Sequence, residues 1–440
     1  MKSNLIRNLL ITFLLLGIVH FSFAQTAKTS GSLNVHQKSI ENWKDLRFGM
    51  FIHWGPVTLK GTEIGWSRGS QVPIEEYDAL YKRFNPANFN ANDWVSAAKA
   101  AGMKYVVLTT KHHDGFCLWN TAQTDYNIMN SPLGRDVVKE LSEACKKQGM
   151  LFGAYYSTTD WHNPDFPLTS PGGKVKREKS DLEAYTSYLK KQVGELLKNY
   201  GPLVTLWFDV PQKFDAKRGQ EVIDFARKIQ PSIVINNRTG AEGDYDTPEQ
   251  KVGSFQNTRP WETCMTIANQ WAWKPNDETK SLQQCLHTLI RTVGGDGNLL
   301  FNVGPKPDGQ IEPLQIDRLK AMGQWLKKHG NTIYGTRGGP FKPNDWGVST
   351  RKGNTIFLHI LKLNGNVPKV VIPDFGMKIK SCRLVDGGKV KLTKQNGSYI
   401  IEFDAKDMQP ISTIVEIKVS GNVMDIQPME FGSQTLSYNK

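Results

Sequence analysis

Cysteine is scarce in this sequence, and the motifs of several common enzyme classes are missing. The five cysteines among 440 residues form no CxxC pair and show no metal-ligand spacing, so we expect neither a disulfide framework nor a zinc site. There is no HExxH segment, which argues against a zinc peptidase. The glycines at 294, 295 and 297 precede a predicted strand and therefore indicate a turn, not a phosphate-binding loop. We expect no metal and no cofactor, and most cysteines should be buried as small apolar residues.

Long apolar runs are also rare, and the one that occurs lies at the N-terminus. Lys2 and Arg7 precede the run 9–19, and small residues follow it before Gln25, which predicts a signal peptide over residues 1–24. No later segment has the length and apolarity of a membrane span. We expect an exported protein, periplasmic or extracellular, whose mature chain has no membrane span; a retained N-terminal anchor is the alternative.

Acidic residues are fewer than basic ones, and the formal net charge is +13. The basic residues are scattered, with only short clusters such as residues 174–177. A solvated basic surface therefore explains the charge better than a nucleic-acid site does. The sequence does not indicate an oligomeric state.

Helical and extended patterns alternate between residues 40 and 338, after a predicted linker over residues 25–39. Helical spacing predicts helices over 92–101, 136–148, 182–199, 220–229, 282–293 and 314–328. Apolar runs predict strands over 105–108, 151–156, 203–208, 233–235 and 299–303. Such strand–loop–helix repeats predict a mostly parallel sheet covered by helices. The length favours a (β/α)8-like, TIM-type barrel, with an open doubly wound sheet as the alternative.

The pattern changes after about residue 339. Short segments rich in Val, Ile and Thr are separated by Gly, Asn and Asp as far as residue 440, which predicts a C-terminal antiparallel β-sandwich domain. The ionisable residues in this part form no recognisable constellation, so we expect a structural or auxiliary role.

Polar and aromatic residues gather where the predicted strands end. His53 follows an apolar segment, His112 and His113 follow the strand at 105–108, and Tyr156 follows the strand that begins at 151. Asp209 ends the strand at 203–208. In a parallel barrel such ends converge on the face that carries the active site. The alternative for Asp209 is that it caps the next helix.

Carboxylates are the residues left to carry a reaction, because the tryptophans and histidines suit the binding of a polyol ring. Retaining glycoside hydrolysis needs one carboxylate that attacks the anomeric carbon and another that protonates the leaving oxygen. We expect Asp209 to be the nucleophile. Glu249 and Glu262 are both candidates for the acid/base, since Trp261 could help raise the pKa of an acid at Glu262. Glu63 is a third carboxylate and is expected to accept hydrogen bonds from ring hydroxyls.

A series of segments in this sequence closely resembles the α-L-fucosidases of glycoside hydrolase family 29. The matching segments are RFGMFIHWGP (47–56), EIGWSRG (63–69), YVVLTTKHHDGFCLW (105–119), GRDVVKEL (134–141), YYSTTDWHNP (155–164), LWFD (206–209), GDYDTPEQ (243–250), WETCMTI (261–267) and GGDGNLLFNVGPKPDG (294–309). They occur in order over about residues 43–336, which spans the predicted barrel and not the C-terminal domain.

The resemblance implies exo-cleavage of terminal α-L-fucose, with retention, from fucosylated oligosaccharides or glycoconjugates. It implies that Asp209 is the nucleophile and that Glu249 or Glu262 is the acid/base, with Glu249 preferred. It implies a fucose pocket made by His53, Glu63, His112, His113, Tyr156, Trp207, Arg238 and Trp271. Two alternatives stay open: a non-catalytic fucose- or glycan-binding protein, and a glycosidase that acts on another sugar. The segment 268–273 departs from the common family pattern, so the linkage preference is not implied.

Overall fold

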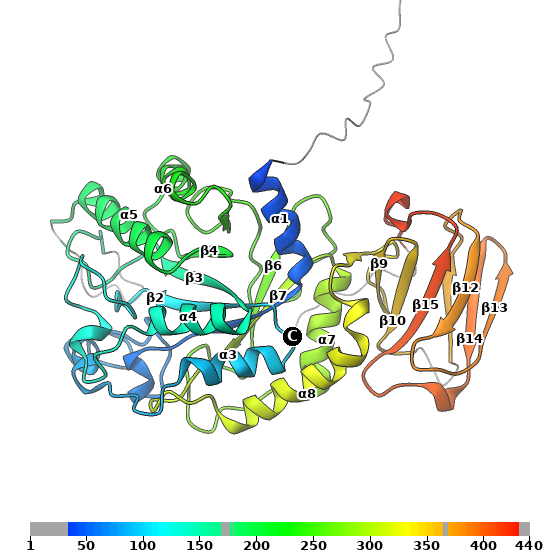
Figure 1. The fold of residues 1–440 in the computed structure, drawn as a ribbon, viewed down its shortest axis with the longest axis horizontal. Helices are drawn as coiled ribbons and strands as arrows, with labels where there is room; N and C mark the ends of the chain where they lie inside the picture. The colour runs from blue at the N-terminus through cyan, green and yellow to red at the C-terminus, as the bar shows by residue number, and fades with distance from the viewer. Residues whose placement is uncertain (1–33, 169–176, 178, 364–367, 431–440) are drawn as a thin grey trace, which may run out of the picture.

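The computed structural model describes residues 34–168, 177, 179–363 and 368–430. Two domains lie side by side: a larger α/β domain and a C-terminal β domain, with helices α7 and α8 between the two sheets in the view of Figure 1. The predicted signal peptide lies outside the described residues. Among the residues that are described, no helix is both long enough and apolar enough to span a membrane.

The larger domain is built on a parallel sheet whose seven strands run in the order β5-β4-β3-β2-β1-β7-β6. The strands are β1 (Phe48–Ile52), β2 (Tyr105–Lys111), β3 (Leu151–Ser157), β4 (Thr205–Asp209), β5 (Val234–Ile235), β6 (Glu262–Thr266) and β7 (Asn298–Val303). Almost every strand residue is buried, as expected for strands that are covered on both faces. Five of these strands follow the predicted apolar runs; β1 covers the apolar segment before His53, and β6 was not predicted.

The two edges of this sheet are joined by the segment 244–250. Tyr245 bridges to Asn236 directly after β5, and Glu249 bridges to Cys264 in β6, both in parallel orientation. The sheet therefore curls into the predicted (β/α)8-like barrel, in which an irregular segment takes the place of one regular strand.

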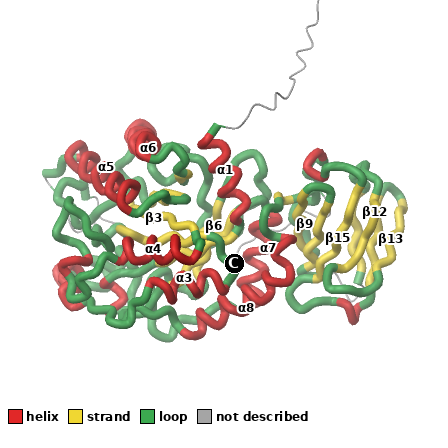
Figure 2. The backbone as a smooth tube through the Cα atoms, viewed as in Figure 1, coloured by secondary structure: helices red, strands yellow, loops and turns green. Residues whose placement is uncertain are grey.

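Helices cover the outside of the barrel (Figure 2), and α3 to α8 lie close to the six predicted ranges, whereas α1 and α2 were not predicted. They are α1 (Val35–Leu46), α2 (Ile74–Ala79), α3 (Ala91–Ala100), α4 (Val137–Gln148), α5 (Leu182–Asn199), α6 (Ala216–Ile229), α7 (Leu282–Gly294) and α8 (Pro313–His329). Helix α4 shows why local sequence suffices: Asp136 caps its first turn and Gly149 ends it with φ +71°. Helix α1 begins inside the segment 25–39 that was predicted as a linker, because Asn34 and Gln37 form a capping box.

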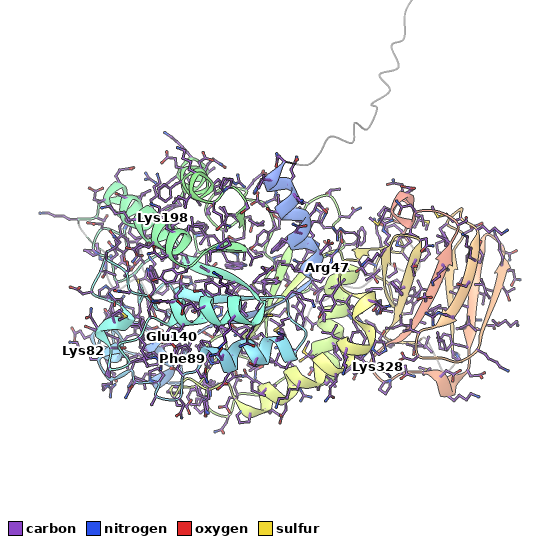
Figure 3. All side chains as sticks on the ribbon, in the orientation of Figure 1. Arg47, Lys82, Phe89, Glu140, Lys198 and Lys328 are labelled. Carbon is purple, nitrogen blue, oxygen red and sulfur yellow. The ribbon has the colours of Figure 1, made fainter. Side chains whose placement is uncertain are left out.

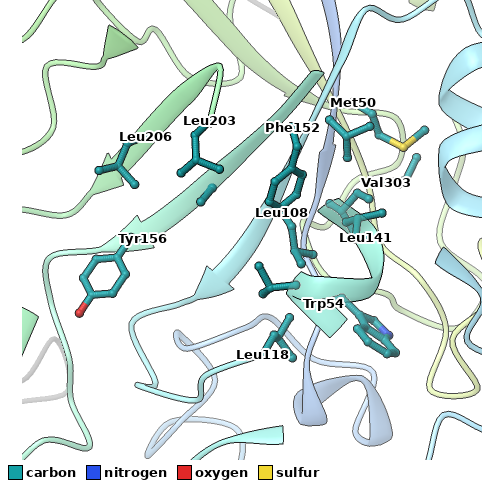
Figure 4. Close-up of a cluster of buried hydrophobic side chains, with 14 of the residues drawn as sticks. Met50, Trp54, Leu108, Leu118, Leu141, Phe152, Tyr156, Leu203, Leu206 and Val303 are labelled. Carbon is teal, nitrogen blue, oxygen red and sulfur yellow. The ribbon is translucent and has the colours of Figure 1, made fainter. Parts of the chain in front are cut away.

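Side chains alternate between the inside and the outside of the barrel. In β4, Leu206 and Phe208 belong to the large outer core between sheet and helices, whereas Trp207 belongs to a smaller core inside the barrel. Figure 4 shows part of the outer core, in which Leu206 and Tyr156 lie on the same side of neighbouring strands. Adjacent residues in a strand therefore have different neighbours. Only the residue that points into the barrel can contribute its side chain to the active-site face.

The C-terminal domain contains a five-stranded sheet, β12-β15-β10-β9-β8, and a three-stranded sheet, β11-β14-β13, each antiparallel. The strands are β8 (Arg337–Gly338), β9 (Gly347–Lys352), β10 (Thr355–Ile360), β11 (Lys369–Pro373), β12 (Ile379–Leu384), β13 (Val390–Gln395), β14 (Ser398–Phe403) and β15 (Thr413–Val419). One apolar core contains residues from both sheets, including Leu358, Ile372, Ile401 and Ile417. This arrangement confirms the predicted sandwich, although β8 begins two residues before the predicted start at 339.

The junction of the two domains is fixed by the buried Arg47, labelled in Figure 3. Its guanidinium donates to the carboxylate of Asp296 at 2.7 Å and to the backbone carbonyl of Gly297. The same carboxylate oxygen accepts a hydrogen bond from the backbone N–H of Gly338 in β8. The start of β1, the turn before β7 and the first strand of the C-terminal sheet are thereby held together.

Candidate active site

Asp209 is the last residue of β4 and lies at the carboxyl end of the barrel, as predicted. One carboxylate oxygen accepts a hydrogen bond from Arg238 and the other accepts one from the Tyr155 hydroxyl, both at 2.8 Å. The alternative role as a helix cap is wrong, because Asp215 caps the helix that follows. Asp209 is therefore free to serve chemistry at the active-site face.

The backbone around Asp209 is held in an unusual conformation. Val210, the next residue, has φ +48°, which is rare for a β-branched side chain. The Thr158 hydroxyl donates to the Asp209 carbonyl at 2.7 Å, and the Thr159 hydroxyl donates to the Val210 carbonyl. These contacts from the end of β3 fix where the Asp209 carboxylate points.

The electrostatic surroundings of Asp209 keep its carboxylate ionised. Burial alone would raise its pKa, but the neighbouring His113 and Arg238 and the hydrogen bonds from Arg238 and Tyr155 lower it below the usual value. A lowered pKa suits a nucleophile, because the attacking group must be unprotonated at neutral pH.

Arg238 joins Asp209 to Glu249. Its Nη1 atom donates to Asp209 Oδ1 at 2.8 Å and to Glu249 Oε2 at 2.9 Å. Thr247 accepts two further hydrogen bonds from the guanidinium, and the Trp207 ring lies 5.0 Å beneath it. Because both oxygens contact the same nitrogen, Asp209 Oδ1 and Glu249 Oε2 are no farther apart than the sum of these two distances. That spacing is below the roughly 6.5–9.5 Å of inverting glycosidases and compatible with the roughly 5–5.5 Å of retaining ones.

Glu262 lies at the opposite end of the barrel from Asp209. It is the first residue of β6 and is fully buried, where it accepts hydrogen bonds from the Tyr105 hydroxyl and from the Trp207 indole nitrogen. Burial raises its pKa to about 7. The raised pKa that was expected of an acid is present, but the side chain is enclosed beneath Trp207. The position contradicts the alternative that Glu262 is the acid/base.

Three histidines cluster beside Asp209. The His53 ring lies 5.6 Å from the His112 ring, and the His113 ring lies 4.0 Å from that of His112. His113 Nε2 is 3.7 Å from Asp209, and its Nδ1 contacts the Ser157 hydroxyl at 2.7 Å. Burial lowers the pKa of all three imidazoles, to about 3 for His53 and about 4 for His113. At neutral pH they are uncharged rings that can bind hydroxyl groups.

The structure corrects the predicted role of Tyr156. Its side chain lies in the outer core, where the hydroxyl donates to Gln192 at 2.8 Å, and Figure 4 shows its ring on the side of Leu206. The preceding residue, Tyr155, points into the barrel, and its hydroxyl contacts Asp209. Side chains alternate along a strand, so a shift of one residue exchanges the pocket for the outer core.

Glu63 and Trp271 lie next to the histidine cluster. The Glu63 carboxylate accepts hydrogen bonds from the backbone N–H groups of Trp271 at 3.0 Å and Ala272 at 3.1 Å. Burial raises its pKa. The Trp271 ring lies 4.8 Å from that of His53. Glu63 therefore holds the segment that carries Trp271, a role that the sequence did not indicate.

Sequence reasoning missed two site residues. Tyr155 was not distinguished from Tyr156, because both strand faces are buried and the apolar pattern does not alternate. Asn302 in β7 contacts both His53 and the Trp271 backbone, and its position inside an apolar strand was the only available signal. Within the part of the chain that the structure describes, no three His, Cys, Asp or Glu side chains form a group that could hold a metal ion.

Comparison with known proteins gives one consistent family. The family model described as "Alpha-L-fucosidase" matches residues 19–331. Human plasma α-L-fucosidase is 30% identical over 364 residues, which cover 74% of this chain and 77% of that protein. An α-L-fucosidase from Dictyostelium discoideum is 28% identical over 413 residues, which cover 85% and 87% of the two chains.

Solved structures agree. α-L-Fucosidase isoenzyme 1 from Paenibacillus thiaminolyticus has a TM-score of 0.80 and 33% identity, covering 88% of this chain and all of that one. A family 29 α-L-fucosidase from Bacteroides thetaiotaomicron, solved as a trapped covalent intermediate with 2-fluoro-fucosyl fluoride, has a TM-score of 0.78 and 25% identity and covers 87% and 96%. Together with the barrel, the two neighbouring carboxylates and the histidine cluster, these matches show that the chain belongs to the α-L-fucosidase family, glycoside hydrolase family 29.

Proposed function

We propose that this protein is a retaining exo-α-L-fucosidase in which Asp209 is the nucleophile and Glu249 is the acid/base. The observation that carries the proposal is the shared contact with Arg238, which keeps the two carboxylates at a separation compatible with a retaining pair. The covalent intermediate trapped in the Bacteroides relative supports the same reaction course.

The two carboxylates have different surroundings that suit their different tasks. The Asp209 side chain is 12% exposed and the Glu249 side chain is 42% exposed. Asp209 attacks the anomeric carbon while Glu249 gives its proton to the departing oxygen, so the glycosidic bond breaks as the bond to Asp209 forms. Glu249 then takes a proton from water, and the resulting hydroxide displaces Asp209 from the sugar. The more exposed position of Glu249 fits a group that must meet both a leaving group and water.

The pocket supports cleavage at a chain end. The Trp207 ring packs against the Arg238 guanidinium that contacts Asp209, and the Trp271 ring packs against His53. We propose that these side chains form a pocket for one terminal sugar ring, in which apolar ring faces contact the sugar and neutral imidazoles bind its hydroxyls. We infer that the substrate is a glycan or glycoconjugate with terminal α-linked fucose.

A panel of aryl glycosides tests the activity. We expect hydrolysis of the aryl α-L-fucoside in preference to galactosides and glucosides, and a loss of several orders of magnitude in Asp209→Asn with the fold intact. Preferred hydrolysis of another sugar would reassign the substrate. Fucose binding in calorimetry without release from any fucoside would identify a non-catalytic binding protein.

Chemical rescue tests the acid/base. On a fucoside with a good leaving group, azide should restore turnover to Glu249→Ala and yield a fucosyl azide. Glu262→Ala, which removes the rejected candidate, should not form this product. A fucosyl azide from the Glu262 variant alone would overturn the assignment.

The site of action is a separate part of the proposal. The basic start, apolar run and small residues of positions 1–24 support export with cleavage before Gln25. Fractionation and N-terminal sequencing of the mature protein test this; an intact Met1 on a protein recovered from the cytosol would contradict it.

A further inference from the structure

Asn302 lies in β7 between two parts of the proposed fucose pocket. Asn302 is 1% exposed, and its neighbours across the sheet are Phe51 in β1 and Thr266 in β6. The side-chain nitrogen donates to the Trp271 carbonyl at 2.8 Å, and the side-chain oxygen lies 2.7 Å from His53 Nδ1. The buried amide of Asn302 thus contacts both His53, which follows β1, and the backbone of Trp271, which follows β6.

These two contacts determine where the proton of His53 resides. The Trp271 carbonyl can only accept a hydrogen bond, so the amide of Asn302 must turn its NH2 group toward it. The amide oxygen then faces His53, and this oxygen can also only accept. His53 Nδ1 must therefore carry the proton, which leaves the lone pair of the neutral ring on Nε2. Among the described residues, no side chain or backbone group bonds to that Nε2.

We propose that Asn302 is a positioning residue that makes His53 a hydrogen-bond acceptor toward the sugar and aligns it with Trp271. This inference rests on the proposed function, because it assigns the polarity of one contact in that pocket. The substrate hydroxyl that meets His53 must then donate its hydrogen.

The charge state of the His53 ring depends on groups from several elements. Asp209 at the end of β4 favours a protonated ring, whereas His113 after β2 disfavours it; the His112 ring lies 5.6 Å away. Burial is the largest influence and disfavours the charged ring. Within the described part of the chain, the one direct hydrogen bond of the ring is to the neutral amide of Asn302, which stabilises an imidazolium less than a carboxylate would. Asn302→Asp would therefore favour the protonated ring, whose Nε2 carries a hydrogen and cannot accept a hydrogen bond.

The tautomer can be measured directly on the wild-type protein. In ¹⁵N-histidine-labelled enzyme at neutral pH, the His53 signals, assigned by their loss in His53→Gln, should show a protonated Nδ1 and an unprotonated Nε2. The opposite tautomer, or a charged ring, would overturn the inference even if fucoside turnover is normal. Absence of fucoside turnover together with the expected tautomer would instead reject the proposed function and leave the role of Asn302 in the pocket geometry intact.

Kinetics supply the second test, with a matched control on the same strand. Asn302→Ala should lower kcat/KM about tenfold or more, because His53 loses its orienting partner. Asn298→Ala removes an equally buried amide at the far end of β7, where it donates to the Trp43 carbonyl, and should leave kcat/KM within about twofold. Equal losses in both variants would reduce Asn302 to a structural residue and refute the proposal.

The pH profile of Asn302→Asp distinguishes a role of Asn302 in positioning His53 from a role in stability alone. Its added carboxylate should move the acidic limb of the kcat/KM profile to higher pH, since the protonated His53 ring cannot accept the sugar hydroxyl. Activity should recover as the pH rises. A profile with the wild-type limb would contradict the inference, and if the variant does not fold, the wild-type tautomer decides.

Discussion

The two adjacent tyrosines of β3 allow a sharp test of how Asp209 is activated. Tyr155→Phe removes the hydroxyl that donates to Asp209 Oδ2 at 2.8 Å and leaves the buried ring in place. The carboxylate then keeps Arg238 as its charged donor but loses one hydrogen bond. We expect the ionised form of Asp209 to be less stable in the variant.

The size of the effect follows from the contact that is lost. A hydrogen bond to a charged group contributes roughly 1.5–3 kcal/mol, and 1.36 kcal/mol corresponds to about one pKa unit. In the proposed mechanism the ionised carboxylate of Asp209 is the active form, so activity should be lost as the pH falls through the pKa of Asp209. Without the Tyr155 hydroxyl this acidic limb of kcat/KM should move upward by about one to two pH units.

The assay is the pH profile of kcat/KM on an aryl α-L-fucoside, with Tyr156→Phe as the control. That variant also removes one buried hydroxyl, but from a contact with Gln192 in the outer core. Its profile should match that of the wild type even if its stability falls. An acidic limb that does not move in Tyr155→Phe, or that moves equally in both variants, would refute the reasoning.

Two further predictions concern stability. Burial raises the pKa of Glu262 to about 7, so the folded state binds its proton more tightly than the unfolded state does. The free energy of unfolding should therefore fall, by up to roughly 3 kcal/mol, as the pH rises from about 4.5 through 7. Glu262→Gln should remove this loss, which thermal unfolding measured from pH 5 to 8 would show. The same pH dependence in wild type and variant would contradict that account. In α8, a Cβ on Gly323 would lie 1.7 Å from the Ala100 carbonyl oxygen of α3, so Gly323→Ala should destabilise the fold by about 1–3 kcal/mol or more. Gly194→Ala in α5, where the nearest atom is Phe225 at 3.5 Å, should be neutral or stabilising by up to about 1 kcal/mol; equal melting points for the two glycine variants would refute the packing argument.

Local sequence was enough to predict most of the scaffold. Helical spacing and end signals such as Asp136 and Gly149 placed α4 within one residue, and the range 182–199 matches α5 at both ends. Asp209 could be recognised because a carboxylate at the end of an apolar strand is exceptional, and the order of strands and helices implied that such ends meet on one face. These features depend on neighbours in the sequence, so they can be read without the fold.

The identity of the second carboxylate and of the pocket tyrosine depended on the tertiary structure. Glu249 and Glu262 both follow Arg238 in a stretch without a clear pattern, but the register of β6 places Glu262 at its first residue, far from the active-site end, while Arg238 brings Glu249 to Asp209. The choice between Tyr155 and Tyr156 depends on which face of β3 is turned inward. A strand that is buried on both faces carries no alternating polarity, so only the curvature of the closed barrel decides which side chain meets the nucleophile.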